Sequence, residues 1–305
     1  MFKADLKKKQ EPVLCLTVRC NQRCLFCSRG GRSSSDSPDR IRALVRRFPD
    51  TICLEGGEPV LAKSLPKWAA YAKKRGTRNI MLVTNGLKLE DPAFAKDLLD
   101  AGVTIFNVNF PAHNRKLSDL ITQTRGNFEK RTAAVKNLIA VAGPGRVRLT
   151  LVLNSLIAGF LPQYAGFVAR TFPGLFYVEV NMIKVLGYVK KRPWLVPNLA
   201  ALKPGLAAAF KAFDRGGVKF LTDGLPLCAI PGYEDRSIDV FKLSYAPAPL
   251  YLAEKKHCAV CAGCTLKAIC PGPRADYLDL YGPAGLKPSR KAPKPIIKKA
   301  ANQLK

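Results

Sequence analysis

The stretch VLCLTVRCNQRCLFC, residues 13–27, joins a run of β-type residues directly to closely spaced cysteines. Cys20, Cys24 and Cys27 follow the pattern C-x3-C-x2-C, with Phe26 just before the third cysteine. Three thiolates leave one iron of a [4Fe–4S] cluster open for a ligand from outside the protein. A structural zinc site prefers four closed ligands, usually as two C-x2-C pairs, and only the second and third cysteines have that spacing. The loop therefore favours an iron–sulfur cluster.

This cysteine loop follows the first of several β-type runs that alternate with amphipathic stretches. Such alternation predicts right-handed βαβ crossovers and a parallel sheet covered by helices. Six units predict an α/β fold, an open, partial (β/α)6 barrel, whose chemistry gathers where the strands end. The predicted strands are Val13–Val18, Thr51–Leu54, Asn79–Val83, Val103–Val108, Val147–Leu153 and Leu175–Val180. The predicted helices are Pro38–Arg47, Leu65–Arg75, Pro92–Ala101, Phe128–Val141, Leu161–Thr171 and a stretch at 205–214.

The alternation stops after about Ile183, and the chain from Lys219 onwards is rich in loops and cysteines. We therefore predict a small Cys-rich C-terminal domain. The predicted organisation is an N-terminal extension at 1–12, the barrel at 13–218, the small domain at 219–283 and a basic tail at 284–305.

The cysteine content and the apolar runs indicate a cytoplasmic protein. Seven of the ten cysteines fall into two groups, which points to metal binding, because disulfides are rare in the cytosol. The start MFKADLKKKQ lacks the apolar core of a signal peptide. The longest apolar run, near Leu149–Leu161, is too short to span a bilayer. We expect no membrane partner.

The chain is strongly basic, with a net charge of +28. The C-terminal 25 residues carry seven basic side chains, no acid and several prolines, a composition that predicts a disordered tail. Without it, +21 of the +28 remains. This charge suits a polyanionic partner such as nucleic acid, an acidic peptide or a phosphorylated small molecule. A solvated basic surface that aids solubility explains it equally well.

A second motif, LEGGEPVL at residues 54–61, follows the second predicted strand. Its glycines allow a tight turn and the close approach of a ligand, and its proline fixes that turn. In this order, the cysteine loop and this motif resemble the signature of the radical S-adenosylmethionine (SAM) superfamily. The resemblance implies that Gly56, Gly57, Glu58 and Pro59 hold the amino group of the methionine moiety of SAM.

The resemblance continues along the later strands. VTNGL, residues 83–87, resembles the TNG of SPASM-type relatives and points to Thr84 and Asn85. Relatives often have Ser-Leu-Asp-Gly at the fourth strand, where this chain has FNVNFPAHN, so either Asn107 or Asn109 takes the place near the SAM ribose. Asn154 at the fifth strand and Gly187 after the sixth complete the implied SAM-binding residues.

The C-terminal cysteines resemble the auxiliary-cluster domains called SPASM or, when shortened, twitch. The resemblance rests on Cys261, Cys264 and Cys270, spaced C-x2-C-x5-C and followed by Gly272 and Tyr277. A full SPASM domain has a further cysteine where this chain has Arg274. The resemblance implies one auxiliary [4Fe–4S] cluster, held by Cys261, Cys264, Cys270 and Cys228, with Cys258 as the alternative to Cys228. Taken alone, this region also fits a zinc knuckle.

Several other residues carry no clear functional pattern. Cys15 and Cys53 lie in predicted strands and are expected to act as small core residues. His113 and His257 have no partner pattern, and no catalytic side chain is assigned.

The family resemblance implies the initiating reaction. SAM binds the open iron, a one-electron reductant such as flavodoxin or ferredoxin reduces the cluster, and SAM yields methionine and a 5′-deoxyadenosyl radical. That radical abstracts a hydrogen from the substrate. We expect a peptide substrate, with a nucleotide or other small molecule of cofactor biosynthesis as the alternative. A non-enzymatic zinc or iron–sulfur protein that binds nucleic acid is the alternative of another class, and the GGEP motif argues against it.

Overall fold

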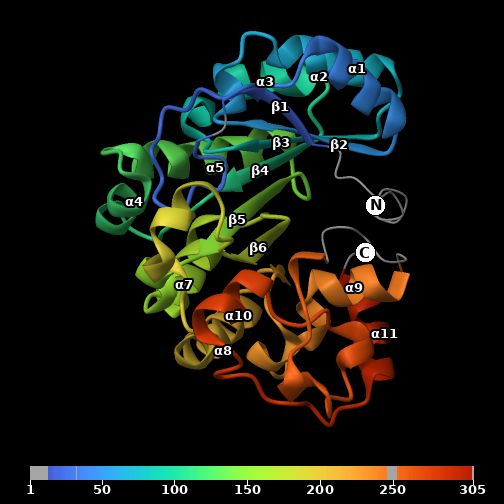
Figure 1. Ribbon diagram of the computed structural model, residues 1–305. Helices are drawn as coiled ribbons and strands as arrows, with labels where there is room; N and C mark the ends of the chain where they lie inside the picture. The colour runs from blue at the N-terminus through green and yellow to red at the C-terminus, as the bar shows by residue number, and fades with distance from the viewer. Residues whose placement is uncertain (1–12, 32, 246–252, 304–305) are drawn as a thin grey trace.

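The computed structural model describes residues 13–31, 33–245 and 253–303, so the predicted extension at 1–12 lies outside the described residues. Its centre is one parallel sheet in which each strand pairs with the next along the chain (Figure 1). In the described residues the last strand does not pair with the first, so the predicted open barrel is confirmed. The strands are β1 (Val13–Thr17), β2 (Thr51–Gly56), β3 (Asn79–Thr84), β4 (Ile105–Asn109), β5 (Val147–Leu153), β6 (Tyr177–Met182) and β7 (Phe220–Asp223).

The two faces of the sheet differ in character. Leu14, Leu54, Leu82 and Phe106 are neighbours in register across the first four strands, and all are fully buried. This row packs under the helices. Because side chains alternate between the two faces along a strand, the residues that follow each member of the row face the inside of the barrel. The inner row is more polar: Asn107 there accepts a hydrogen bond from Thr150 on β5 at 2.7 Å.

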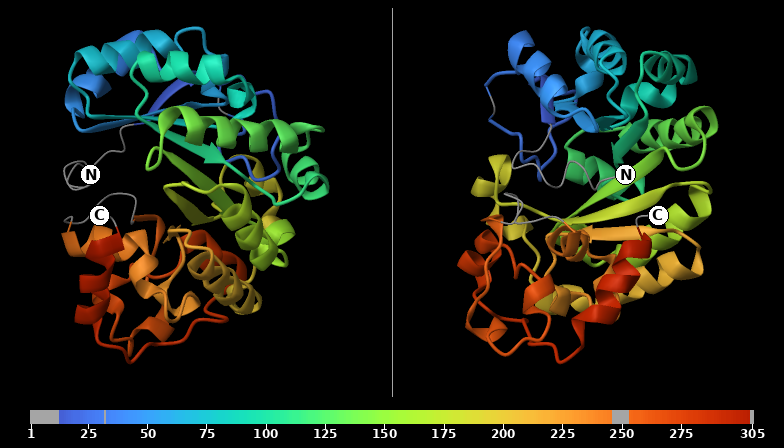
Figure 2. Two further views of the ribbon diagram at one scale, coloured as in Figure 1. Left: turned by 180° about the vertical axis from the view of Figure 1, so that it is seen from behind. Right: turned by 90° about the vertical axis from the view of Figure 1, so that its right-hand side faces the viewer.

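Helices cover the outer face of the sheet, as the two views of Figure 2 show. Several begin at a side-chain cap that satisfies a free backbone N–H; Ser37, for example, accepts from the N–H of Arg40. The helices are α1 (Pro38–Arg47), α2 (Leu65–Lys74), α3 (Pro92–Asp100), α4 (Arg115–Thr122), α5 (Asn127–Ala142), α6 (Ser155–Ala158), α7 (Leu161–Thr171), α8 (Leu199–Arg215), α9 (Ile238–Tyr245), α10 (Ala275–Tyr281) and α11 (Pro293–Gln303).

The seventh strand corrects the prediction of a six-stranded sheet that ends before residue 219. β7 pairs in parallel with β6, Val178 aligning with Phe220 and Asn181 with Asp223. With four residues it is too short to stand out as a period-2 pattern, and it is a strand because it pairs with β6. The sheet therefore extends into the range predicted for the C-terminal domain.

The prediction of a disordered basic tail is wrong for residues 293–303, which form α11. Pro293 and Pro295 lie in the first turn, where a helix has no use for the missing N–H, so they start the helix instead of breaking it. Ile296 and Ala300, four residues apart, are both buried. The helix packs against α9, and Lys291 just before it pairs with Glu234 at 2.5 Å.

We expect Ile296→Ala to lower the free energy of unfolding by about 2 to 3 kcal/mol, because truncating a buried isoleucine leaves a cavity. Lys298→Ala, at an exposed position of the same helix, should change it by less than about 0.5 kcal/mol. Urea denaturation of both variants measures the difference. Equal effects would mean that α11 does not pack on the domain.

Within the described residues, none of the helices combines the length and the apolar character needed to cross a bilayer.

Candidate active site

The loop with Cys20, Cys24 and Cys27 leaves β1 and is held from one side by the end of α4. The N–H of Arg23 donates to the carbonyl of Thr122 at 3.2 Å, and the N–H of Leu25 donates to the carbonyl of Ile121 at 2.9 Å. Gln123, the next residue, adopts a left-handed φ of 51°. These are the free carbonyls of a helix end, so the cysteine loop caps α4. This helix was not among those predicted from the sequence.

On its other side the same loop contacts the segment after β6. The N–H of Tyr188 donates to the carbonyl of Cys27 at 3.1 Å, and Arg192 donates to the carbonyl of Leu25 at 3.3 Å. Gly187 has a left-handed φ of 55°, and a Cβ there would lie 2.5 Å from the carbonyl oxygen of Cys27. The turn predicted around Gly187 therefore packs directly on the cysteine loop.

The GGEP motif lies against the chain that leads into the cysteines. The N–H of Gly57 donates to the carbonyl of Thr17, and that of Glu58 to the carbonyl of Arg19, both at 2.7 Å. Gly56 has a φ of 151°, and a Cβ there would collide with the same carbonyl of Thr17. Glycine is thus required by the close approach of two backbone segments.

Glu58 is buried and joins the ends of β2 and β3. Its carboxylate accepts hydrogen bonds from the Thr84 hydroxyl and the Asn85 N–H, both at 2.6 Å, and from the Val60 N–H at 3.3 Å. Burial raises the pKa of Glu58, against the effect of these donors. The GGEP and TNG motifs, two separate stretches of the sequence, therefore form one hydrogen-bonded unit.

Phe26, the aromatic residue just before the third cysteine of the loop, packs against the hydrophobic core.

Arg131 of α5 is a buried residue that sequence analysis missed. Its guanidinium donates to the carbonyl of Asn85 at 2.9 Å and to Gln22 Oε1, inside the cysteine loop, at 3.0 Å. The signal was present: Arg131 stands three residues after Phe128 and four before Val135, on the apolar stripe of its helix.

The thiols of the loop are close enough to influence one another. Burial is the main cause that raises the pKa of Cys24 to about 12; the thiols of Cys27 and Cys20 contribute to this rise, and Arg131 opposes it. Burial also raises the pKa of Cys20. Metal binding needs the thiolates, so it would release protons here. Within the described residues, no three His, Cys, Asp or Glu side chains converge on a single-ion site. A cluster held at separate corners by three thiolates, beside a buried cation, fits this donor set.

The remaining predicted SAM-binding residues lie along the ends of β4 and β5. Asn107 bonds to Thr150, as above, and the Asn109 amide donates to the Thr150 carbonyl at 3.4 Å. Asn154 is the N-cap of α6, its side chain accepting from the Leu156 N–H at 3.1 Å. The sheet thus brings them to the same edge as the GGEP motif, while each already has a partner in the protein.

The C-terminal cysteines converge on a second location. Cys228, Cys261, Cys264 and Cys270 line one cavity beside the loops near 257–273 and 286–289. Cys258 lies next to them, its Sγ 3.8 Å from that of Cys261. Burial raises the pKa of Cys270 to about 11. The chain therefore gathers both predicted alternatives at one place.

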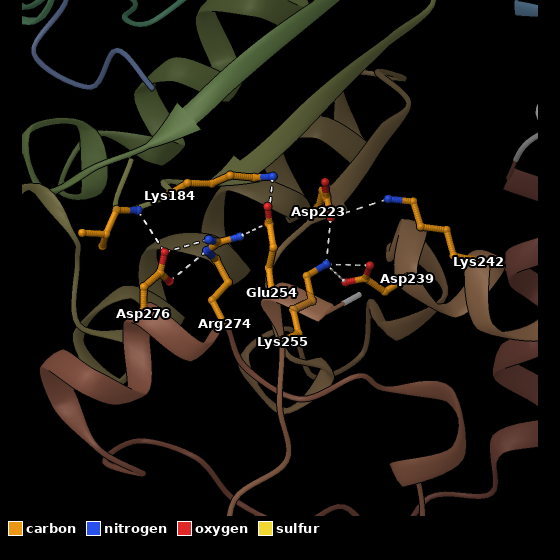
Figure 3. A network of polar contacts seen from close by, with 9 residues as sticks. Lys184, Asp223, Asp239, Lys242, Glu254, Lys255, Arg274 and Asp276 are labelled. Carbon is orange, nitrogen blue, oxygen red and sulfur yellow. Dashed lines mark hydrogen bonds and ion pairs between the residues drawn. The ribbon is translucent and has the colours of Figure 1, made fainter. Parts of the chain in front are cut away.

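An ion-pair network fastens this C-terminal region to the sheet (Figure 3). Arg274 pairs with Glu254 and with Asp276, each at 2.7 Å, and Asp276 accepts the N–H of Val185 at 2.9 Å. Lys184 reaches the same Glu254 at 2.9 Å. Arg274, which occupies the place of a further SPASM cysteine, thus connects the C-terminal region to the segment after β6.

The second half of the network is centred on Lys255, whose side chain is 4% exposed. Its ammonium lies 2.6 Å from Asp239 and 3.0 Å from Asp223, at the end of β7. Although burial opposes it, Lys242 and Lys255 hold the pKa of Asp223 well below its usual range. These residues were not predicted from the sequence because they lie far apart along the chain.

The comparisons with known proteins agree with this arrangement. Residues 14–155 match the family model described as "Radical SAM superfamily". The chain is 34% identical over 134 residues to the "Probable GTP 3',8-cyclase" of Methanococcus vannielii, covering 41% of this chain and 44% of that one. It is 29% identical over 154 residues to the protein of that name from Methanopyrus kandleri, covering 48% of each. The chain therefore spans less than half the length of these curated relatives.

The solved structures that resemble this chain share its fold. The one described as "Native anSMEcpe with bound AdoMet" superposes with a TM-score of 0.54 at 15% identity, over 84% of this chain and 70% of that chain. The structure described as HydG, a maturase of the [FeFe]-hydrogenase, gives a TM-score of 0.51 at 12% identity, over 70% and 50%. At such identities the likeness concerns the fold alone.

Proposed function

Because the chain carries a radical SAM domain over residues 14–155, we propose that it is an enzyme that cleaves SAM at a [4Fe–4S] cluster held by Cys20, Cys24 and Cys27. The observation that carries the proposal is that the GGEP motif, with its buried Glu58, is hydrogen-bonded at one edge of the sheet to the chain that leads into the cysteine loop. Reduced by one electron, such a cluster supplies the reductive cleavage of bound SAM to methionine and a 5′-deoxyadenosyl radical.

In this proposal, the residues of this chain bind and orient SAM. The GGEP segment, Gly56 to Pro59, presents its backbone and Glu58 to the amino group of SAM. Asn107 or Asn109 lies near the ribose, and Asn154 and the turn at Gly187 contact the adenosyl end. The packing of Gly187 on Cys27 supports this assignment, because it places that turn beside the cysteine loop.

For the C-terminal cysteines we propose one auxiliary [4Fe–4S] cluster, with Cys228, Cys261, Cys264 and Cys270 as ligands and Cys258 as the alternative to Cys228. The fact that these four proposed ligands line one cavity supports this assignment. A one-electron donor such as flavodoxin or ferredoxin would supply the reducing equivalent for the first cluster.

For the substrate, a nucleotide is favoured over the peptide that we expected from the sequence. The curated relatives are named as GTP 3',8-cyclases, whereas the likeness to anSMEcpe concerns the fold. Lys267 and Lys287 line the cavity of the C-terminal cysteines, where cationic side chains suit an anionic ligand.

The first test is made on protein purified and reconstituted without oxygen. It should be brown, hold about eight irons per chain if both clusters are of the four-iron type, and form 5′-deoxyadenosine from SAM and dithionite. Iron analysis measures the iron content, and chromatography measures the 5′-deoxyadenosine formed. Colourless protein with stoichiometric zinc would overturn the proposal.

The second test concerns the substrate. With SAM and dithionite, GTP should be consumed and should increase the formation of 5′-deoxyadenosine. If deuterated GTP loses its label to 5′-deoxyadenosine, the nucleotide is the hydrogen donor. A protein that cleaves SAM but leaves GTP unchanged would contradict only the substrate assignment.

A further inference from the structure

Arg131 carries a buried positive charge that has no anionic partner in direct contact. Its exposed fraction is 1%. Among the described residues no carboxylate forms an ion pair with its guanidinium. Burial lowers the pKa of Arg131 to about 10, so at neutral pH the side chain still carries its proton. A buried charge that lacks a counter-charge in direct contact costs several kcal/mol, which calls for an explanation.

The hydrogen bonds of Arg131 all end on neutral acceptors. Beside Asn85 and Gln22, its Nη1 donates to Asn127 Oδ1 at 2.7 Å and to Ser118 Oγ at 3.2 Å. These bonds fix the plane of the guanidinium and engage all three of its nitrogens. They do not neutralise its charge.

The charge is directed toward the cysteine loop. Gln22, which accepts from Arg131, also accepts from the Cys24 thiol, with Sγ and Oε1 3.7 Å apart. Toward Glu58 the path runs through Asn85, whose carbonyl accepts from Arg131 and whose N–H donates to the carboxylate. The carboxylates of Glu58 and Asp119 also act on Arg131 electrostatically, but neither forms an ion pair with it.

We propose that Arg131 is the buried counter-charge of the cluster bound by Cys20, Cys24 and Cys27, and that it positions the cysteine loop through Gln22. The inference rests on the proposed function, since it assigns to the bound cluster the part of a close anionic partner, which no carboxylate of the described residues plays through an ion pair. Three thiolates give the bound cluster that negative charge. Arg131 is thus a positioning residue that acts without touching SAM or substrate.

The effect on the cluster has a definite sign. Reduction takes one electron from the external donor and makes the cluster more negative by one charge. A fixed cation in a buried, low-dielectric site stabilises the more negative state and raises the reduction potential. Removing that cation must lower the potential.

The test is a redox titration of reconstituted holoprotein followed by electron paramagnetic resonance, using the signal that changes when SAM is added. In Arg131→Gln the ratio of reduced to oxidised cluster at fixed potential should fall at least tenfold, about 59 mV for a one-electron couple. Arg131→Lys keeps the charge and should remain near the wild type. The matched control is Arg148→Gln, which removes another buried arginine, one that pairs with Tyr177 at 2.5 Å.

Each outcome decides the inference. Equal potentials in the wild type and Arg131→Gln would overturn it, as would an equal shift in Arg148→Gln. If Arg131→Gln does not retain the cluster, the iron content of the two variants decides. Iron retained in Arg131→Lys supports a need for the positive charge. Iron lost from both variants would mean that only the packing of the arginine matters, which overturns the inference. A wild-type protein with no SAM-responsive cluster would instead contradict the proposed function.

Discussion

Replacing Cys20, Cys24 and Cys27 together with alanine should abolish 5′-deoxyadenosine formation and remove about four of about eight irons. The three thiols lie in one loop and are the proposed ligands of the cluster that binds SAM, so none of the other cysteine groups replaces them. The irons that remain should belong to the C-terminal cavity, which lies in a separate part of the fold. Iron analysis and single-turnover assays with SAM measure both effects.

The control for this experiment is Cys53→Ala, which removes a thiol of β2 outside both proposed ligand sets. It should keep all the iron and most of the activity. Loss of every iron in the triple variant would mean that the two cysteine groups do not hold independent clusters.

Gly57→Ala should weaken SAM binding at least tenfold, about 1.4 kcal/mol, and lower the stability of the protein. A Cβ at Gly57 would lie 2.5 Å from the carbonyl oxygen of Val18 and would also collide with that of Arg19. These are backbone atoms just before Cys20, so relief of the clash must displace the cysteine loop relative to GGEP. Isothermal titration with SAM and thermal unfolding measure the two effects.

The matched control is Gly159→Ala, at a glycine with a right-handed φ of −74° and no atom within 4 Å of the added Cβ. It should bind SAM as the wild type does. If Gly57→Ala also bound SAM normally, the close packing of the two segments would not be needed for the site.

The expectations that proved correct came from local patterns. The β-type run before Cys20 predicted β1, and similar runs predicted β2 to β6 to within a few residues. The cysteine spacing and the GGEP motif predicted the radical SAM domain. Each depends on residues within a few positions of one another, where backbone preference and ligand spacing act directly.

Errors arose where a local rule met a different tertiary context. Pro293 and Pro295 suggested a chain without helix, yet at the start of α11 they are compatible with it, and burial of Ile296 stabilises the helix. β7 is too short to stand out, and its pairing with β6 makes it a strand. Both α11 and β7 are stabilised by contacts with segments that lie elsewhere in the sequence, and a local pattern does not show such contacts.

The sequence by itself thus determined the fold class, the cysteine loop and the GGEP motif, because period and spacing are properties of neighbouring residues. Only the tertiary structure decided which distant groups form hydrogen bonds with each other. Gln22 and Arg131 are 109 residues apart and hydrogen-bonded, and Val185 and Asp276 are 91 apart and also bonded. An arginine on an apolar stripe signals a buried charge, but the groups that surround it are fixed by chain folding, since electrostatic energy depends on distance in space.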